Sequence, residues 1–215
     1  MLKIVNYIAL LCCCVIFFLK LGVGHNLMVF ENEICVIKSF NLKEHIKKNV
    51  IIGLEDRKQK WSQNNINLLT DVLHVGYKEF EIDPNDVLAI ISIESWFTIK
   101  AFNRNSAKSF DYGLTQINNI NWNKLTNRSI KIFKKHNFVY SKCHSKYDIA
   151  INVMNCFVYF DGTKRVLSLK KLYTKKRWIQ SYNTGIRGSL SNKKRHKKRR
   201  TKYWNLFWHK RKLFL

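Results

Sequence analysis

The segment from Asp83 to Trp96 constrains the fold of this chain more than any other. Asp83 is a favourable N-cap residue, and Pro84 suits the first helical position because its missing N–H would have no partner there. Asp86 places a negative charge in the first turn, where the helix dipole favours it. The pattern therefore predicts a helix from Pro84 to about Trp96.

The apolar face of this helix ends in a carboxylate. Val87, Ile90 and Ile91 share one face at helical spacing, and Glu94 continues that face one turn later. A buried carboxylate costs free energy unless it is paired or protonated, and no Lys or Arg lies at helical spacing to pair with Glu94. Desolvation and the negative end of the helix dipole both favour the neutral acid, so we expect a raised pKa. We interpret Glu94 as a functional residue.

Glycine and proline are scarce in this chain, with 8 Gly and 1 Pro in 215 residues. This scarcity disfavours a large sheet with many tight turns, and the hydrophobic fraction of 46% is sufficient for a core. We expect one mainly α domain. The polar stretch from Thr98 to Tyr112, rich in Asn and Ser, is predicted to be a loop or a small hairpin.

Apolar spacing predicts further helices. One begins near Trp61 and is expected to stop near Gly76. Two others are predicted over about Tyr147 to Tyr159 and Val166 to Tyr182. Apolar spacing also returns between Gly113 and Asn121. The stretch 25–60 is mixed in character, and we interpret it as an N-terminal extension of the domain.

The first 24 residues have the pattern of a targeting segment. Lys3 precedes an uninterrupted apolar run from Tyr7 to Leu19, and the small residues Gly22 and Gly24 follow it. We interpret 1–24 as a signal peptide, with an uncleaved N-terminal membrane anchor as the alternative. Either interpretation predicts an exported protein, periplasmic or secreted.

The cysteines beyond the targeting segment allow two interpretations. In an oxidising compartment Cys143 and Cys156 could form a disulfide and leave Cys35 unpaired, or they could be buried free thiols. Zinc-binding spacings such as Cys-x-x-Cys do not accompany them. We therefore expect neither a metal nor another cofactor.

Positive charge dominates the composition and concentrates toward the C-terminus. The formal net charge is +25, and 19 Lys and Arg residues follow Asp161 without another acidic side chain. Such a field attracts polyanions, including nucleic acid, anionic lipid headgroups and acidic cell-wall polymers. The alternative interpretation of this charge is that Lys residues are distributed over a solvated surface and have no specific partner. Residues 189–215 are predicted to form a basic tail, in which the run Lys193 to Arg200 precedes the aromatic residues Tyr203, Trp204 and Trp208.

Three short motifs occur in order: Glu94-Ser95, the segment YGLTQIN from Tyr112 to Asn118, and the segment SYNTG from Ser181 to Gly185. Together they resemble the lysozyme-like lytic transglycosylases of the SLT domain type. The resemblance is closest to the small exported transglycosylases associated with bacterial secretion systems, and it covers about Trp61 to Gly185. Because three pieces agree in order and spacing, the combination is far more specific than any one of them.

The resemblance implies a lysozyme-like, mainly α (α+β) domain over residues 61–188. It also implies cleavage of the β-1,4 bond between N-acetylmuramic acid and N-acetylglucosamine in peptidoglycan glycan strands. A single glutamate, here Glu94, is implied to act first as acid and then as base. The product would carry a 1,6-anhydro-N-acetylmuramic acid end, formed without water.

The resemblance also implies roles for six residues around Glu94. Tyr182 is expected to orient the Glu94 carboxyl through a hydrogen bond. The expected contributors to substrate binding are Ser95, Gly113, Leu114, Gln116, Tyr182 and Asn183. Of these, Gln116 and Asn183 would contact the glycan, Ser95 would support the site from behind, and Gly113 would let the sugar approach the backbone.

The family's serine between its first two motifs has no clear counterpart here. Many members use that serine to contact the N-acetyl group of the substrate. In this chain the corresponding loop is longer, and it offers four candidates: Asn103, Asn105, Ser106 and Ser109.

Two alternatives remain open from the sequence. If Asp111 reached the far face of the sugar, it could activate water and make the protein a hydrolytic, lysozyme-type muramidase. Alternatively, the chain could be a non-catalytic basic module that binds anionic wall or membrane through its C-terminal tail. Export argues against nucleic acid as the natural partner, whereas an anionic membrane surface or components of a secretion system are compatible with it. The sequence does not indicate an oligomeric state.

Overall fold

The computed structural model describes residues 41–140 and 145–215. The chain divides into two compact units, Met1–Leu42 and Lys43–Leu215, and nearly all of the first lies outside the described residues. The predicted signal peptide or anchor (1–24) and Cys143 also lie outside them. Within the described part of the chain, no helix is both long and apolar enough to cross a membrane.

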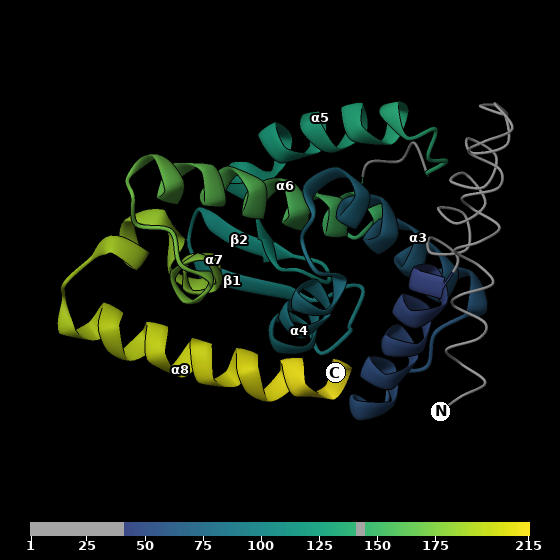
Figure 1. The fold of residues 1–215 in the computed structure, drawn as a ribbon, viewed down its shortest axis with the longest axis horizontal. Coiled ribbons are helices and arrows are strands. Elements are labelled where there is room, and N and C mark those ends of the chain that lie inside the picture. The colour runs from purple at the N-terminus through teal and green to yellow at the C-terminus, as the bar shows by residue number, and fades with distance from the viewer. Residues whose placement is uncertain (1–40, 141–144) are drawn as a thin grey trace, which may run out of the picture. The chain divides into compact units, whose positions relative to one another are not determined.

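The second unit is mainly helical with one small antiparallel sheet, as the sequence predicts (Figure 1). Residues 41–56 are helical. The elements that follow are α3 (Gln63–Phe80), α4 (Pro84–Glu94), β1 (Phe102–Ser106), β2 (Ser109–Tyr112), β3 (Ile117–Asn118), α5 (Asn119–Lys135), α6 (Ile149–Leu169), α7 (Lys175–Leu190), α8 (Lys194–Arg211) and the 3-10 helix η1 (Lys212–Phe214).

Helix α4 is the buried centre of the domain, and its predicted signals are confirmed. The side chain of Asp83 accepts a hydrogen bond from the backbone N–H of Asn85, and Pro84 opens the helix. Val87, Ile90 and Ile91 are completely buried. The apolar character of this helix on most of its sides therefore reflects burial among the other helices.

Helix α3 continues one turn past the predicted stop at Gly76. A Cβ at Gly76 would lie 2.4 Å from the ring of Phe157, so this glycine permits close packing against α6 and does not end the helix. The helix ends at Phe80, where Glu81 adopts a left-handed conformation. The predicted stop was wrong because close helix contact, not chain reversal, explains this glycine.

The two helices predicted after residue 147 have different boundaries. Asp148 caps α6, which runs without interruption to Leu169, and Thr174 caps α7 through a hydrogen bond to its own first turn. The predicted break near residues 160–165 is therefore wrong. The second of these helices was expected to end at Tyr182. In α7 the regular helical backbone breaks at Gly185, with φ of 67°, and a further helical stretch runs on to Leu190.

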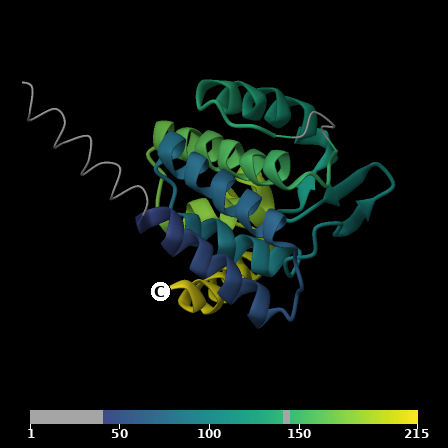
Figure 2. The same ribbon diagram turned by 90° about the vertical axis from the view of Figure 1, so that its right-hand side faces the viewer.

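The polar stretch after α4 forms the predicted hairpin. Strands β1 and β2 are antiparallel, and β3 pairs with β2 on its other side. In this register Asp111 lies opposite Asn103 on one neighbour and opposite Asn118 on the other. Directly opposed residues project to the same face of a sheet, so these three side chains form one polar strip. Figure 2 shows the hairpin extending away from the helices.

Helix α5 was not predicted as a helix of its own. The apolar spacing seen between Gly113 and Asn121 belongs instead to a turn, to β3 and to the start of α5. Asn118 caps α5 by accepting a hydrogen bond from the N–H of Ile120. The short strand therefore leads directly into the helix.

Part of the stretch interpreted as an N-terminal extension packs into the helical domain. Ile46, Val50 and Leu54 are buried. Arg57 donates hydrogen bonds to Ser92, at 3.1 Å to its Oγ and 3.0 Å to its backbone oxygen. These contacts tie the segment after residue 43 to the last turns of α4.

The C-terminal segment 189–215 is also integrated into the helical domain. It forms α8 and η1, and α8 packs against both α4 and α7. Tyr203, Phe207 and Phe214 are buried, whereas most of the Lys and Arg residues of the run 193–200 are exposed. The basic tail is thus an amphipathic helix with one face in the core.

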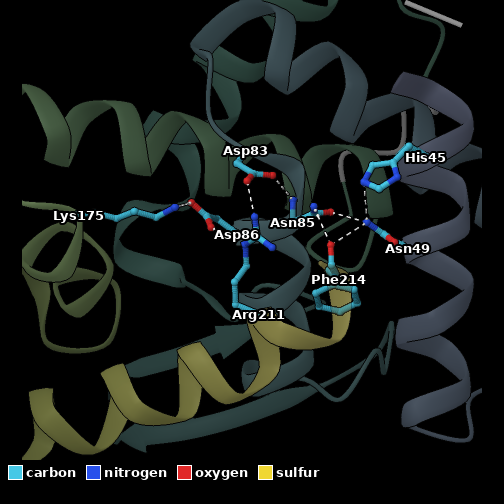
Figure 3. Close-up of polar contacts among 8 residues, drawn as sticks. All are labelled: His45, Asn49, Asp83, Asn85, Asp86, Lys175, Arg211 and Phe214. Carbon is cyan, nitrogen blue, oxygen red and sulfur yellow. Dashed lines mark hydrogen bonds and ion pairs between the residues drawn. The ribbon is translucent and has the colours of Figure 1, made fainter. Parts of the chain in front are cut away.

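Arg211 fastens the end of α8 to the start of α4 (Figure 3). Its Nε donates to Asp86 Oδ1 at 3.0 Å, and its Nη2 donates to Asp83 Oδ2 at 2.5 Å. The other oxygen of Asp86 pairs with Lys175 Nζ at 2.8 Å. The two acids that favour the helix start therefore also anchor the C-terminal segment.

A second polar contact holds η1 in the same region (Figure 3). Asn85 Nδ2 donates to the backbone oxygen of Phe214 at 3.1 Å, and Asn49 Nδ2 donates to Asn85 Oδ1 at 2.8 Å. The C-terminal segment, α4 and the helix at 41–56 thus meet in one hydrogen-bond network.

We predict that Arg211→Gln destabilises the protein by about 3 kcal/mol, because removing one partner of a buried ion pair leaves an uncompensated charge. The Asp86 side chain is only 2% exposed, so it cannot recover full hydration. Urea unfolding would measure the loss. Lys212→Gln, at the neighbouring exposed position, is the matched control. Equal unfolding midpoints for the two variants would show that Arg211 does not anchor α8.

Candidate active site

A cleft of about 530 Å³ brings together the ends of several elements. Glu94 at the end of α4 lies in it with the polar strip of the hairpin, and residues of α5, α6, α7 and α8 complete its lining. Two of the predicted glycan-contacting side chains, Gln116 and Asn183, line the cleft, as does Tyr182. The three sequence motifs therefore converge on one cleft.

The Glu94 carboxyl is largely buried and holds its proton more tightly than a free glutamate. Desolvation by burial is the main cause, and the nearby negative charge of Asp111 adds to it. A hydrogen bond from Tyr203 and the positive charge of Arg199 act in the opposite direction. The net effect raises the pKa of Glu94 to about 7. This direction agrees with the expectation from the sequence.

Tyr203 of α8 donates the hydrogen bond that orients Glu94, with 2.6 Å between its Oη and Glu94 Oε1. The sequence had assigned this bond to Tyr182. Tyr182 instead donates its hydroxyl proton to the backbone oxygen of Thr115 at 2.5 Å, and its ring stacks on Phe160. A phenol has one proton to donate, so Tyr182 in this arrangement supports the turn that follows β2.

Asn152 on α6 holds that turn in place and was missed by the sequence analysis. Its Oδ1 accepts hydrogen bonds from the backbone N–H and the hydroxyl of Thr115, both at 2.8 Å. Its Nδ2 donates to the backbone oxygen of Tyr112 at 2.8 Å. Asn152 is completely buried, and such a side chain must find hydrogen-bond partners.

Gly113 and Leu114 serve the turn and the core. Gly113 has φ of +73°, and a Cβ there would lie 2.4 Å from Asn152 Nδ2. The close approach that requires this glycine is therefore to Asn152, whereas the sequence suggested the sugar. Leu114 is 1% exposed and packs in the core, away from the cleft lining.

Gln116, Asn183 and Ser95 occupy three different positions relative to the cleft. Gln116 has φ of 50° and donates from its Nε2 to the backbone oxygen of Gly113 at 2.9 Å. Asn183 accepts a hydrogen bond from Arg199 Nε at 2.8 Å. Ser95 is buried behind Glu94, where its hydroxyl donates to the backbone oxygen of Ile91 at 3.2 Å.

The structure reduces the four candidates for the N-acetyl contact to three. Asn103, Asn105 and Ser109 line the cleft, and Ser106 does not. Asp111 also lines the cleft, where both of its oxygens accept hydrogen bonds. The donors are Asn118 Nδ2 at 2.7 Å and Asn105 Nδ2 at 2.5 Å.

The described residues contain no group of three His, Cys, Asp or Glu side chains arranged to hold a metal ion. Cys156 on α6 is a fully buried free thiol, and burial raises its pKa. The bridge to Cys143 that the sequence allowed is therefore not made by Cys156 in this structure. Its thiol contacts Tyr182 beneath the cleft.

In a comparison with protein families, the sequence model described as the transglycosylase SLT domain matches residues 71–205. This span is more than half of the chain and runs from α3 into α8. The chain belongs to the transglycosylase SLT domain family. It is a peptidoglycan lytic transglycosylase, a lyase that cleaves glycosidic bonds in the cell wall. Comparisons with curated proteins and with solved structures give no match.

The matched span extends beyond Gly185, where the motifs quoted from the sequence end, and includes Tyr203 and Arg199. The sequence analysis placed both residues in a basic, aromatic tail and assigned neither of them a role beside Glu94. A usable signal was the spacing of Tyr203 and Phe207, which repeats an aromatic residue after four positions. Both are buried, as expected for the core-facing side of a helix.

Because the pKa of Glu94 is raised, it should make the stability of this transglycosylase depend on pH. Below pH 4.5 the group is protonated in both the folded and unfolded states and has no effect. Between pH 4.5 and 7 the unfolded chain releases the proton first, so stability is lost as pH rises. One pKa unit is worth about 1.4 kcal/mol, and with a discount for partial exposure the total is about 2 kcal/mol.

We therefore predict that Glu94→Gln has a larger free energy of unfolding than the wild type at pH 8, by about 2 kcal/mol, as measured by urea unfolding. At pH 4 the two proteins are expected to have the same free energy of unfolding. Glutamine keeps an acceptor for Tyr203, so the hydrogen bond survives the change. Glu55→Gln, at an exposed position, controls for the loss of one charge. A stability difference between Glu94→Gln and the wild type that is the same at both pH values would contradict the raised pKa.

We predict that Tyr203→Phe raises the pKa of Glu94 further. The hydrogen bond from Tyr203 stabilises the ionised carboxylate, and the variant lacks this bond. A carboxyl-carbon NMR titration with labelled glutamate would measure the shift. Tyr159→Phe is the matched control, since its hydroxyl lies in the same cleft lining but donates to the backbone oxygen of Ser181. An unchanged or lowered pKa in Tyr203→Phe would count against the assigned role of the hydroxyl.

Proposed function

We propose that Glu94 alone supplies both proton transfers of the lytic reaction. As an acid it protonates the oxygen between N-acetylmuramic acid and N-acetylglucosamine, and this bond breaks as positive charge develops on the muramoyl C1. As the resulting carboxylate it removes the proton from the muramoyl C6 hydroxyl. The C6 oxygen then bonds to C1, giving a 1,6-anhydro end and regenerating the acid.

The observation that carries this proposal is the position of Glu94 in the cleft, with its pKa raised to about 7. Near neutral pH such a group is present in both protonation states, so it can donate a proton and then accept one. Proton transfer by one positioned group contributes a factor of about 10² to 10⁴ in rate. The hydrogen bond from Tyr203 restricts the carboxyl to one orientation and leaves its other oxygen for the substrate.

The glycan is proposed to lie against the polar residues of the cleft. Gln116, Asn183 and the amides of the hairpin strip offer donors and acceptors for sugar hydroxyl and N-acetyl groups. Tyr182 contributes a wall of the cleft and fixes the turn beside it. In this proposal Ser95, Gly113 and Leu114 act indirectly, by shaping the end of α4 and that turn.

Hydrolysis is the second candidate chemistry, and one observation favours it. Asp111 lines the same cleft as Glu94, so a second carboxylate is available there. However, both of its oxygens already accept hydrogen bonds from the side-chain amides of Asn105 and Asn118, so both are engaged within the hairpin strip. We therefore assign Asp111 to holding the hairpin strip.

The setting proposed for this reaction is the cell wall outside the cytoplasm. The targeting pattern of residues 1–24 supports export, with a cleaved signal or a retained anchor as the two forms. The exposed Lys and Arg residues of α8 would hold the enzyme near anionic wall polymer or membrane, and this attraction weakens as salt rises. The resemblance to the small exported transglycosylases makes a secretion apparatus one setting for the reaction. A purely binding role for the basic surface remains the rival.

We predict that digestion of purified peptidoglycan by the wild type yields 1,6-anhydro ends and that Glu94→Gln abolishes them, with turnover reduced at least about 100-fold. Mass spectrometry of the muropeptides distinguishes anhydro ends from reducing ends by the mass of one water. Asp111→Asn is expected to keep anhydro products. Reducing ends that disappear in Asp111→Asn would replace this proposal with hydrolysis, and unchanged turnover by Glu94→Gln would remove Glu94 from the chemistry.

A further inference from the structure

Arg199 is the one basic side chain among the described residues that line the cleft. It lies on α8, one turn before Tyr203, and its positive charge lowers the pKa of Glu94. The lining also contains two carboxyl groups, those of Glu94 and Asp111. The cleft therefore contains one guanidinium group beside a polar lining that consists mainly of amide and hydroxyl groups.

The guanidinium of Arg199 is held in place by one hydrogen bond, and its other N–H donors remain available. Its Nε donates to Asn183 Oδ1 at 2.8 Å, which fixes the group beside the segment that also carries Tyr182. The Nη groups supply four further N–H donors. Among the described residues no carboxylate forms an ion pair with Arg199, and its side chain is exposed. The free edge of the guanidinium is thus open to a ligand.

Neighbouring arginines on α8 do not present free donors to the cleft as Arg199 does. Arg200 donates from Nη1 to the backbone oxygens of Gly188 at 2.6 Å and Ser191 at 2.8 Å, so it closes the link between α7 and α8. Arg195 is exposed one turn earlier and does not line the cleft. The position of Arg199 in the cleft is therefore specific, and it is not explained by the general basicity of the helix.

We infer that Arg199 binds a carboxylate of the muramoyl unit, so that this transglycosylase favours glycan strands whose muramic acid carries a free negative charge. The inference rests on the proposed function, because it takes the peptidoglycan strand as the ligand of the cleft. Sugar rings and N-acetyl groups are neutral, and neutral groups do not require a guanidinium. A carboxylate, in contrast, matches two parallel N–H donors and gives a charge-assisted bidentate contact.

Two sources can supply that carboxylate. Strands stripped of peptide expose the lactyl carboxylate, which is attached directly to the muramoyl ring. Strands that retain their peptides have this group in an amide bond, and their carboxylates lie further out along the peptide. Both sources present the same chemistry to Arg199, so the test includes both.

The test measures binding without turnover, in the full chain carrying Glu94→Gln. Dissociation constants are compared by calorimetry at one ionic strength for three probes: peptide-free glycan strands, peptide-bearing glycan strands, and a neutral hexamer of N-acetylglucosamine. Arg199→Gln is expected to weaken binding of one of the two muramoyl strands by about 10- to 100-fold, as for loss of a charged hydrogen bond. Binding of the neutral hexamer is expected to change less than about 3-fold.

Matched variants separate a specific site from general attraction. Arg199→Lys keeps the charge without the fork and is expected to restore binding in part. Arg195→Gln removes a charge from the same helix outside the cleft and is expected to leave the preference unchanged. Weakening restricted to the peptide-free strand would identify the lactyl carboxylate, and weakening restricted to the peptide-bearing strand would identify a peptide carboxylate.

Three outcomes would overturn the inference: no weakening with any probe, equal weakening with all three, or the same effect from Arg195→Gln. The thermal unfolding midpoint of each variant shows whether α8 is still docked. Because binding is measured with Glu94 already replaced, the result does not depend on which product the wild type forms. Failure of the proposed chemistry would appear instead in the end groups of digested peptidoglycan.

Discussion

The hydrogen bond between Tyr203 and Glu94 is the contact on which the rest of the site depends. It joins the end of the most buried helix to a helix near the C-terminus, across a sequence separation of 109 positions. The bond needs α8 in register along α4, and that register is set at the other end of the helix. There Arg211 meets Asp83 and Asp86 at the first turn of α4. Helices α4 and α8 are therefore joined both at the candidate site and at the ion pairs that anchor the C-terminal segment.

The electrostatics of the cleft follow from its opposing charges. Burial and Asp111 favour the neutral acid at Glu94, while Tyr203 and Arg199 favour the carboxylate. A group required to donate and then accept a proton should have similar free energies in the two forms near the working pH. The opposing contributions place the pKa of Glu94 at about 7.

The sequence predicted correctly those elements whose start or turn depends on a few neighbouring residues. The N-cap, proline and first-turn acid of α4 lie within four consecutive residues, and that helix was predicted correctly with Glu94 at its end. The Asn- and Ser-rich hairpin was predicted for the same reason. Gly76 was misread because it meets the ring of Phe157, a contact that depends on tertiary packing.

The candidate site was predictable only where its motifs are contiguous. Glu94, Gln116 and Asn183 were recognised because each lies in a short, recognisable segment, and all three line the cleft. Tyr203 and Arg199 lie among many Lys and Arg residues, so the composition suggested a separate basic tail with aromatic residues. The contact between this segment and Glu94 was missed for that reason. Asn152 gave no local signal, since its role depends on backbone groups 37 to 40 positions away.

The length of chain between Glu94 and its tyrosine partner also affects how the enzyme is made. A polypeptide threaded through a ribosome or a translocation channel emerges in order, so Glu94 appears well before α8. Until the last helix has emerged and docked, the carboxyl lacks its partner and one wall of the cleft is missing. A chain that ended before α8 would therefore lack both the hydrogen bond to Glu94 and the one basic side chain that lines the cleft in the described part of the structure.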